Sequence, residues 1–205
     1  LADIFKQLEN RGAHNINLVT PTHYVLSIKK ALEICKPKIP VVYNSSGYER
    51  VEALKSLEGL VDIFLLDLKY LSPDRAQRYS GAFDYPEYAK KAILEACRQS
   101  PKCEFKDGIM QKGVIIRHLL LPQGTKEAMA VFDWVRENTP DAYFSIMSQY
   151  TPCGNAENYK EINRKVTKRE YNKVLDYICS FDFPNVYIQE QTSADKKYIP
   201  DFNMK

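Results

Sequence analysis

The sequence has no apolar run near the ~20 residues of a membrane-spanning helix, so no such helix is predicted. Its 29 basic and 26 acidic residues leave a net charge of +3. The basic residues are scattered rather than gathered in a stripe, so no nucleic-acid surface is expected. The chain begins Leu1-Ala-Asp-Ile, without an initiator Met or a signal-peptide pattern. We therefore expect a fragment of a longer polypeptide, with neither membrane nor nucleic acid as a partner.

Cysteine is sparse and irregularly placed. The count is odd and the gaps are uneven, so neither a disulfide framework nor a close-spaced thiolate metal site is predicted. Reduced thiols and a cytoplasmic location are the default for such a chain. The five positions are Cys35, Cys97, Cys103, Cys153 and Cys179.

What the sequence does contain is a regular alternation of strands and helices, which predicts a parallel sheet with right-handed crossovers. We expect an α/β fold forming a partial (β/α)6 TIM-like barrel, with residues 1–205 as a single domain. The expected strands cover residues 15–19, 39–43, 61–70, 113–121, 143–150 and 185–189. The expected helices cover residues 2–11, 25–36, 48–56, 86–98, 125–138 and 168–180.

The strand at residues 61–70 places an acid and a base on one face. Side chains alternate along a strand, so Asp67 and Lys69 point to the same side as Leu65. A buried parallel strand tolerates such groups at its carboxyl end, where active sites of α/β barrels lie. A paired, partly solvated Asp and Lys without chemistry is the alternative.

Arg117 stands in the middle of an apolar strand, where an unpaired guanidinium would cost several kcal/mol. It must therefore meet an acid or a bound anion. An ion pair with Asp67 and a carboxylate or phosphate ligand both remain open. His118 follows on the opposite face and is expected to be structural.

The other strand ends are also polar. Their convergence predicts a polar pocket at one rim of the sheet, although helix caps and turns would explain each one singly. The residues are Thr20, Thr22 and His23 after the first strand, Asn44 and Ser45 after the second, and Gln149 and Tyr150 after the fifth.

Three segments together resemble the radical S-adenosylmethionine enzymes, in the branch related to the pyruvate formate-lyase activating enzyme. They are Leu65-Leu-Asp-Leu-Lys69, Arg117-His-Leu-Leu-Leu-Pro-Gln-Gly124 and Asn44-Ser-Ser-Gly47. The resemblance implies S-adenosylmethionine and a [4Fe–4S] cluster as cofactors. It implies reductive cleavage of S-adenosylmethionine to a 5′-deoxyadenosyl radical that abstracts hydrogen. The implied partners are a glycyl-radical enzyme or other protein substrate, and flavodoxin or ferredoxin as electron donor.

The sequence departs from that family in one decisive place. The three-cysteine loop CxxxCxxC, whose thiolates would hold the cluster, does not occur in the 205 residues. The resemblance also implies that the first barrel strand is missing. We therefore expect this fragment to lack turnover by itself and the cluster to belong to the full-length protein. An exposed sheet edge would be liable to dimerise.

The resemblance assigns cofactor contacts residue by residue. Thr20, Thr22 and His23 stand where the family has a turn that cradles the methionine amino group. Asn44 and Ser45 match a pair that, with Asp67, holds a monovalent cation, and Asn in place of Asp removes a charge.

Four further positions are expected to contact the cofactor. Lys69 would neutralise a carboxylate, and Arg117 would contact the methionine or ribose portion. Gln149 and Tyr150 lie near an adenosine-binding position. No catalytic residue is assigned within the fragment.

Two alternatives from other classes stay open. One is a barrel lyase or aldolase in which Lys69 is a Schiff-base nucleophile, activated by burial beside Arg117. The other is a non-catalytic domain whose barrel mouth docks a partner protein.

Overall fold

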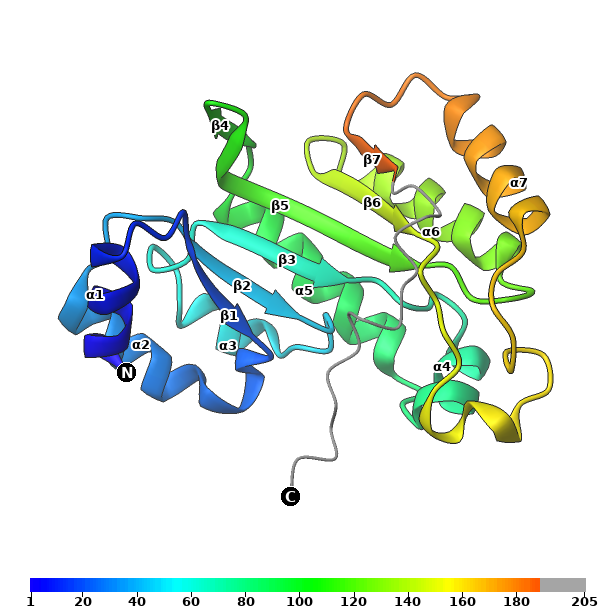
Figure 1. The fold of residues 1–205 in the computed structure, drawn as a ribbon, viewed down its shortest axis with the longest axis horizontal. Helices are drawn as coiled ribbons and strands as arrows, with labels where there is room; N and C mark the ends of the chain where they lie inside the picture. Colours follow the sequence, from blue (N-terminus) through cyan, green and yellow to red (C-terminus); the bar gives the residue numbers. More distant parts are fainter. Residues whose placement is uncertain (189–205) are drawn as a thin grey trace.

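The computed structural model describes residues 1–188, and its centre is an open seven-stranded sheet (Figure 1). Six strands run parallel in the order β1-β2-β3-β5-β6-β7, and β4 pairs antiparallel with β5. The strands are β1 Ile16–Val19, β2 Val41–Ser45, β3 Ile63–Asp67, β4 Glu104–Lys106, β5 Ile109–Leu119, β6 Tyr143–Met147 and β7 Val186–Ile188.

Helices connect successive strands, and α5 and α6 pass behind the sheet in Figure 1. None of the helices in residues 1–188 has the length and apolar character needed to cross a membrane. The α-helices are α1 Ala2–Asn10, α2 Val25–Cys35, α3 Val51–Lys55, α4 Pro73–Ser80, α5 Tyr85–Gln99, α6 Thr125–Asn138 and α7 Lys168–Cys179. Two short 3-10 helices, η1 Pro21–Tyr24 and η2 Gly154–Asn158, follow β1 and β6.

The two faces of the sheet differ in burial. On β3 and β5, Phe64, Leu66 and Ile116 point to the helical side and are fully buried. Leu65 and Arg117 alternate with them and are only partly buried. Because side chains alternate along a strand, this pattern means that helices cover one face and that the other face, which would line a barrel, is left partly open.

The parallel α/β prediction is confirmed, although the bounds of several elements differ from those expected. The strand expected at residues 61–70 ends at Asp67, although Leu68 N still donates to Arg117 O at 2.8 Å. The helix expected at residues 48–56 covers only Val51–Lys55. The backbone first turns at Gly47, whose φ of 78° is left-handed, so the helix starts later than its sequence pattern suggests.

The linker-like residues 101–112 predict an exposed turn or a short hairpin before the next strand, and the structure shows a hairpin between β4 and β5. Asp107 and Gly108, both with positive φ, make the turn between β4 and β5. Ser72-Pro73 predicts a helix start, with Ser72 as the N-cap and Pro in the first turn. Helix α4, which is not among the six expected helices, begins there, and Arg75 N donates to the Ser72 hydroxyl. The segment Thr167-Lys-Arg-Glu170 has the sequence pattern of a capping box, and that box is present at the start of α7.

Candidate ligand-binding site at the carboxyl edge of the sheet

Asp67 and Arg117 lie opposite each other in the β3–β5 register, near the carboxyl ends of both strands. Arg117 Nε donates to Asp67 Oδ1 at 2.8 Å, and its Nη2 lies 2.8 Å from the same oxygen. Nη2 also donates to Asn44 Oδ1 at 2.8 Å. Three neighbouring strands therefore hold one guanidinium, and the ion pair left open by the sequence exists.

The pair is only partly desolvated, because 24% of the Arg117 side chain and 20% of the Asp67 side chain are exposed. Burial raises the pKa of the Asp67 carboxyl, while the positive charges of Arg117 and Lys69 act in the opposite direction. Within residues 1–188, Asp67 and Asn44 occupy two of the three guanidinium nitrogens. Nη1 is left to meet a ligand.

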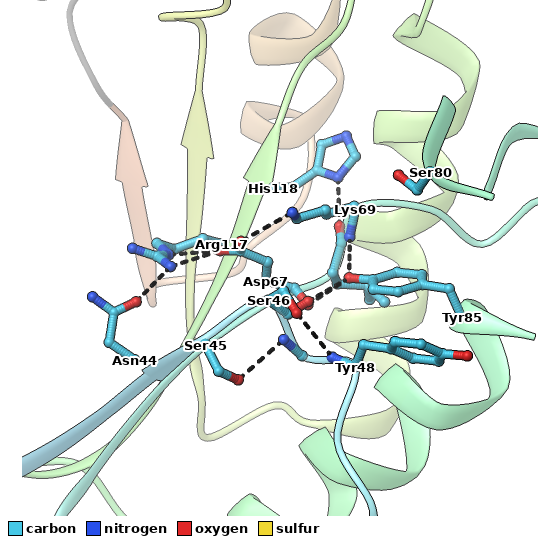
Figure 2. A network of polar contacts seen from close by, with 12 residues as sticks. Asn44, Ser45, Ser46, Tyr48, Asp67, Lys69, Ser80, Tyr85, Arg117 and His118 are labelled. Carbon is cyan, nitrogen blue, oxygen red and sulfur yellow. Dashed lines mark hydrogen bonds and ion pairs between the residues drawn. The ribbon is translucent and has the colours of Figure 1, made fainter. Parts of the chain in front are cut away.

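Lys69 lies beside this pair but is held loosely. Its Nζ is 3.9 Å from Asp67 Oδ2, and 43% of its side chain is exposed (Figure 2). Two cations therefore face one carboxylate, so the cluster carries one formal positive charge. Such a cluster favours a ligand that carries an anionic group.

A cavity of 370 Å³ opens directly over these groups. This volume lies within the range of small-molecule sites. Its lining combines charged and polar side chains with apolar ones, a mixture suited to a ligand that has both a charged group and an apolar or aromatic group. The lining residues are Asp67, Lys69, Tyr70, Arg117, Leu119, Leu121, Met147, Gln149 and Tyr150.

A buried tyrosine braces the cavity from beneath. The hydroxyl of Tyr85, on α5, donates toward the carbonyls of Ser46 and Asp67 at 2.9 Å and accepts from Lys69 N at 2.9 Å (Figure 2). Tyr85 is only 3% exposed. Because it ties the loop after β2 to the end of β3, it fixes the backbone that carries Asp67 and Lys69. The sequence pattern gave no signal for this role.

Gly47 closes the same junction. A Cβ on this residue would lie 2.1 Å from the carbonyl oxygen of Asp67. No side chain fits there, so the close approach of these two backbones requires glycine. The Gly at the end of Asn44-Ser-Ser-Gly47 was the available signal.

His118 faces away from the cavity and is structural, as expected. It is 2% exposed, and its Nδ1 lies 2.7 Å from the carbonyl oxygen of Leu68. Burial lowers the pKa of His118, so the ring is neutral. Since a carbonyl only accepts, Nδ1 carries the proton.

The residues after β1 do not line this cavity. Thr20 and His23 are exposed, and Thr20 N donates to Asn44 O at 2.8 Å. The Thr22 hydroxyl donates to the buried carboxylate of Glu49 at 2.5 Å. The cavity forms at β3, β5 and β6, so the five strand ends converge on one rim but not on one pocket.

Ser45 does not join Asn44 and Asp67. It is 3% exposed, lies on the face opposite Asn44, and accepts from Gly47 N at 3.2 Å. The oxygens of Asn44 and Asp67 meet the guanidinium of Arg117 instead. The three expected ligands of a monovalent cation are therefore not gathered at one point.

On β6 and its following loop, Gln149 and Tyr150 do reach the cavity. Gln149 is exposed and Tyr150 is partly buried. Burial is also the main reason that the pKa of Tyr150 is raised. Tyr150 therefore offers an aromatic ring with a protonated hydroxyl to the cavity.

The part of the chain that the structure describes contains no group of three or more His, Cys, Asp or Glu side chains placed to hold a metal ion. The five cysteines are separate free thiols. These residues therefore do not fit a [4Fe–4S] cluster, which needs converging thiolates.

Comparison with known proteins finds a relative by sequence and a solved domain of similar fold. No family model matches. The sequence is 32% identical over 176 residues to an uncharacterized protein of Methanocaldococcus jannaschii, a match that covers 84% of this chain and 48% of that protein. The chain thus spans about half the length of the curated relative it matches.

The fold is that of a partial, open TIM-like barrel. A solved domain of pyruvate-formate lyase-activating enzyme from Bacteroides vulgatus superposes with a TM-score of 0.61. The alignment covers 86% of this chain and 98% of that domain, at 11% sequence identity. At this identity the likeness establishes the fold, and function must be argued from the site.

Proposed function

We propose that this chain is the S-adenosylmethionine-binding barrel of a radical enzyme related to the pyruvate formate-lyase activating enzyme. The observation that carries the proposal is the cavity over Lys69 and Arg117, which has a net positive charge and lies at the carboxyl edge of a parallel sheet. Ligands of open α/β sheets bind at this edge. Similarity of the fold to a domain of that activating enzyme supports it.

In this proposal the carboxylate of S-adenosylmethionine meets the ammonium of Lys69 and the Nη1 of Arg117. Asp67 and Asn44 hold the guanidinium in place, so it does not reorganise when the ligand binds. The apolar side chains that line the cavity, including Leu119, contact the adenosine. When bound and reduced by one electron, S-adenosylmethionine would supply a 5′-deoxyadenosyl radical for hydrogen abstraction.

The remainder of the activity is proposed for the full-length protein. A [4Fe–4S] cluster would need ligands outside residues 1–188, because the described residues do not provide them. A glycyl-radical enzyme or another protein would be the substrate, and flavodoxin or ferredoxin would be the electron donor. This chain's own contribution is to bind and orient the cofactor.

The structure gives less support to a Schiff-base lyase. A nucleophilic lysine must be a free amine, which burial away from carboxylates promotes. Lys69 is instead 43% exposed and lies 3.9 Å from the Asp67 carboxylate, so it is neither buried nor away from an acid. We expect borohydride to trap no carbonyl compound on Lys69. A trapped adduct at Lys69 would support the lyase.

Calorimetry with two ligands tests the proposal. S-adenosylmethionine carries the amino acid group, whereas 5′-methylthioadenosine has the same nucleoside without it. We expect the full chain to bind the first at least ~10-fold more tightly, about 1.4 kcal/mol, because only it reaches Lys69 and Arg117.

An Arg117→Gln variant supplies the control, since it should reduce this preference and leave the weak nucleoside affinity unchanged. If neither S-adenosylmethionine nor 5′-methylthioadenosine binds, the proposal is contradicted. If a partner protein still binds when both ligands fail, the cavity is a docking surface instead.

A further inference from the structure

Six tyrosines form an unbroken series of ring contacts behind the cavity. Each ring lies against the next, although the residues come from five separate parts of the chain, namely the loops after β2, β3 and η2 and the helices α4 and α5. The centroid distances are 5.4 Å for Tyr88–Tyr48, 5.8 Å for Tyr48–Tyr85, 5.7 Å for Tyr85–Tyr70, 6.3 Å for Tyr70–Tyr79 and 5.5 Å for Tyr79–Tyr159.

The series runs from the cavity to the surface. Tyr70 lines the cavity and is 7% exposed, and Tyr85, behind it, is 3% exposed. The rings of Tyr85 and Tyr48 lie next to each other in Figure 2. Tyr48 and Tyr88 reach solvent, with 40% and 37% exposure. Tyr70 and Tyr85 are therefore buried from solvent, whereas the rings of Tyr48 and Tyr88 are exposed to it.

A tyrosine can give up one electron, and the oxidised ring persists where its hydroxyl can lose its proton. Electron transfer falls off steeply with distance, so rings in contact are suited to pass an electron in steps. A hydrogen-bonded base is then needed where the oxidised tyrosine is to rest. The two directions from Tyr70 differ in this respect.

In the direction of Tyr48, a carboxylate is placed to accept the proton of the oxidised tyrosine. The Tyr48 hydroxyl donates to Asp84 Oδ1 at 2.5 Å, an acceptor for its proton. In the other direction, Tyr79 donates to Glu161 at 3.1 Å, but Arg78 also binds that carboxylate. A backbone hydrogen bond and, next to it, Arg78 lower the pKa of Glu161, so this carboxylate is a weaker proton acceptor. The guanidiniums of Arg75 and Arg78 lie 5.5 Å and 5.8 Å from the centre of the Tyr79 ring. Two cations over a ring oppose removal of an electron from it.

We propose that Tyr70, Tyr85 and Tyr48 form a path that carries an oxidising equivalent from the cavity to the surface, where it rests on the Tyr48–Tyr88 pair. The branch through Tyr79 is electrostatically closed. The path would reduce a one-electron oxidant in the cavity that has not reacted with a substrate.

The step balances as follows. The exposed hydroxyl of Ser80 donates to the Tyr70 hydroxyl at 3.2 Å. A one-electron oxidant in the cavity takes an electron from Tyr70, and the Ser80 hydroxyl rotates to accept the Tyr70 proton and passes one to solvent. An electron then passes from Tyr48 through Tyr85 to Tyr70, which regains a proton by the same route. Tyr48 gives its proton to Asp84. The net products are the reduced oxidant, a Tyr48 phenoxyl radical and a protonated Asp84.

The source of the oxidant rests on the proposed function, which would place a carbon-centred radical in the cavity. Such a radical takes the electron and a solvent proton to become a C–H group. The electron path itself depends only on the geometry of the tyrosines. It can therefore be tested without the cofactor.

The test uses a ruthenium polypyridyl photo-oxidant attached to Cys153, which is exposed on the loop that carries Tyr150. The full chain carries Cys179→Ser, which removes the other exposed thiol among residues 1–188. A flash with a sacrificial electron acceptor oxidises the cavity side. A nitroxide then traps tyrosyl radicals, and peptide mass spectrometry locates the adducts. We expect adducts at Tyr48 and Tyr88.

Three variants decide the path. Tyr85→Phe and Tyr70→Phe should each reduce the Tyr48 adduct to the level of Tyr24, an exposed tyrosine outside the series. Tyr70→Phe keeps the test valid if Tyr85→Phe fails to fold. Tyr79→Phe should leave the Tyr48 adduct unchanged.

An unchanged Tyr48 adduct in both relay variants, or adducts confined to Tyr79 and Tyr159, would overturn the path. Since no S-adenosylmethionine is present, this result is independent of the calorimetry. Failure of the ligand to bind and failure of the path are thus separate outcomes.

Discussion

Arg117 places two of its nitrogens on a single oxygen of Asp67. Nε and Nη2 both lie 2.8 Å from Oδ1, whereas Oδ2 faces Lys69 Nζ at 3.9 Å. One carboxylate thus positions both cations of the cavity. The arrangement leaves each cation with capacity for a further anion, which a symmetric two-oxygen pair would not do as readily.

The first prediction concerns the energy of this pair. A double-mutant cycle with Asp67→Asn and Arg117→Gln should give a coupling of about 1–3 kcal/mol in the free energy of unfolding, because the pair is partly desolvated and its hydrogen bonds are short. Urea denaturation measures it. The control is the exposed i,i+4 pair of Lys91 and Glu87, for which we expect about 0.3–0.5 kcal/mol. Equal couplings for the two pairs would contradict this account.

Lys69 should separate stability from ligand affinity. Its side chain is 43% exposed and its contact with Asp67 is loose, so Lys69→Met should change the free energy of unfolding by no more than about 0.5 kcal/mol. Affinity for S-adenosylmethionine should fall about tenfold, or about 1.4 kcal/mol. Lys102→Met, an exposed change before β4, should alter neither quantity. If Lys69→Met leaves the affinity for S-adenosylmethionine unchanged, Lys69 does not belong to the binding site.

Gly47→Ala should be far more damaging than Gly12→Ala. Both glycines have a positive φ, of 78° and 77°, so both variants pay the cost of a left-handed alanine, about 1 kcal/mol. A Cβ at Gly12 meets nothing within 4 Å, whereas at Gly47 it would overlap the Asp67 carbonyl. We expect Gly47→Ala to lose at least ~2 kcal/mol more. Similar losses in thermal unfolding would show that the junction adapts easily.

Glu170 should give the fold a pH-dependent stability. The Arg164 guanidinium, helped by the N–H groups of Thr167 and Gln123, holds the pKa of Glu170 well below its usual range. Its contribution is therefore full above the unfolded pKa of about 4.3 and is lost as the pH falls toward the folded pKa. At pH 7, Glu170→Gln should lower the free energy of unfolding by about 1–2 kcal/mol.

The difference between wild type and Glu170→Gln should shrink steadily below about pH 4. Urea titrations at several pH values measure this. Thr167→Ala removes the cap hydroxyl without removing the charge. A loss that stays constant for Glu170→Gln down to pH 2 would contradict the assigned cause.

The alternation of strands and helices was sufficient to predict the parallel sheet, because burial between helix and sheet imposes a local pattern on each segment. Phe64, Leu66 and Ile116 show this pattern and lie where it predicts. Arg117 could be predicted to need a partner for the same reason. The β4–β5 hairpin and the capping box are also local, and their residue types indicated them.

The sequence by itself thus determined the α/β fold and the need for a counter-charge at Arg117, since both follow from the burial preferences of neighbouring residues. Only the tertiary structure decided that Asp67 and Asn44 meet that cation, that Ser45 turns away, and that Tyr85 braces the junction. Strand register and the packing of α5 against the sheet set these contacts between residues 16 to 73 positions apart in the chain. No local pattern encodes such distances, because they arise only when the strands assemble.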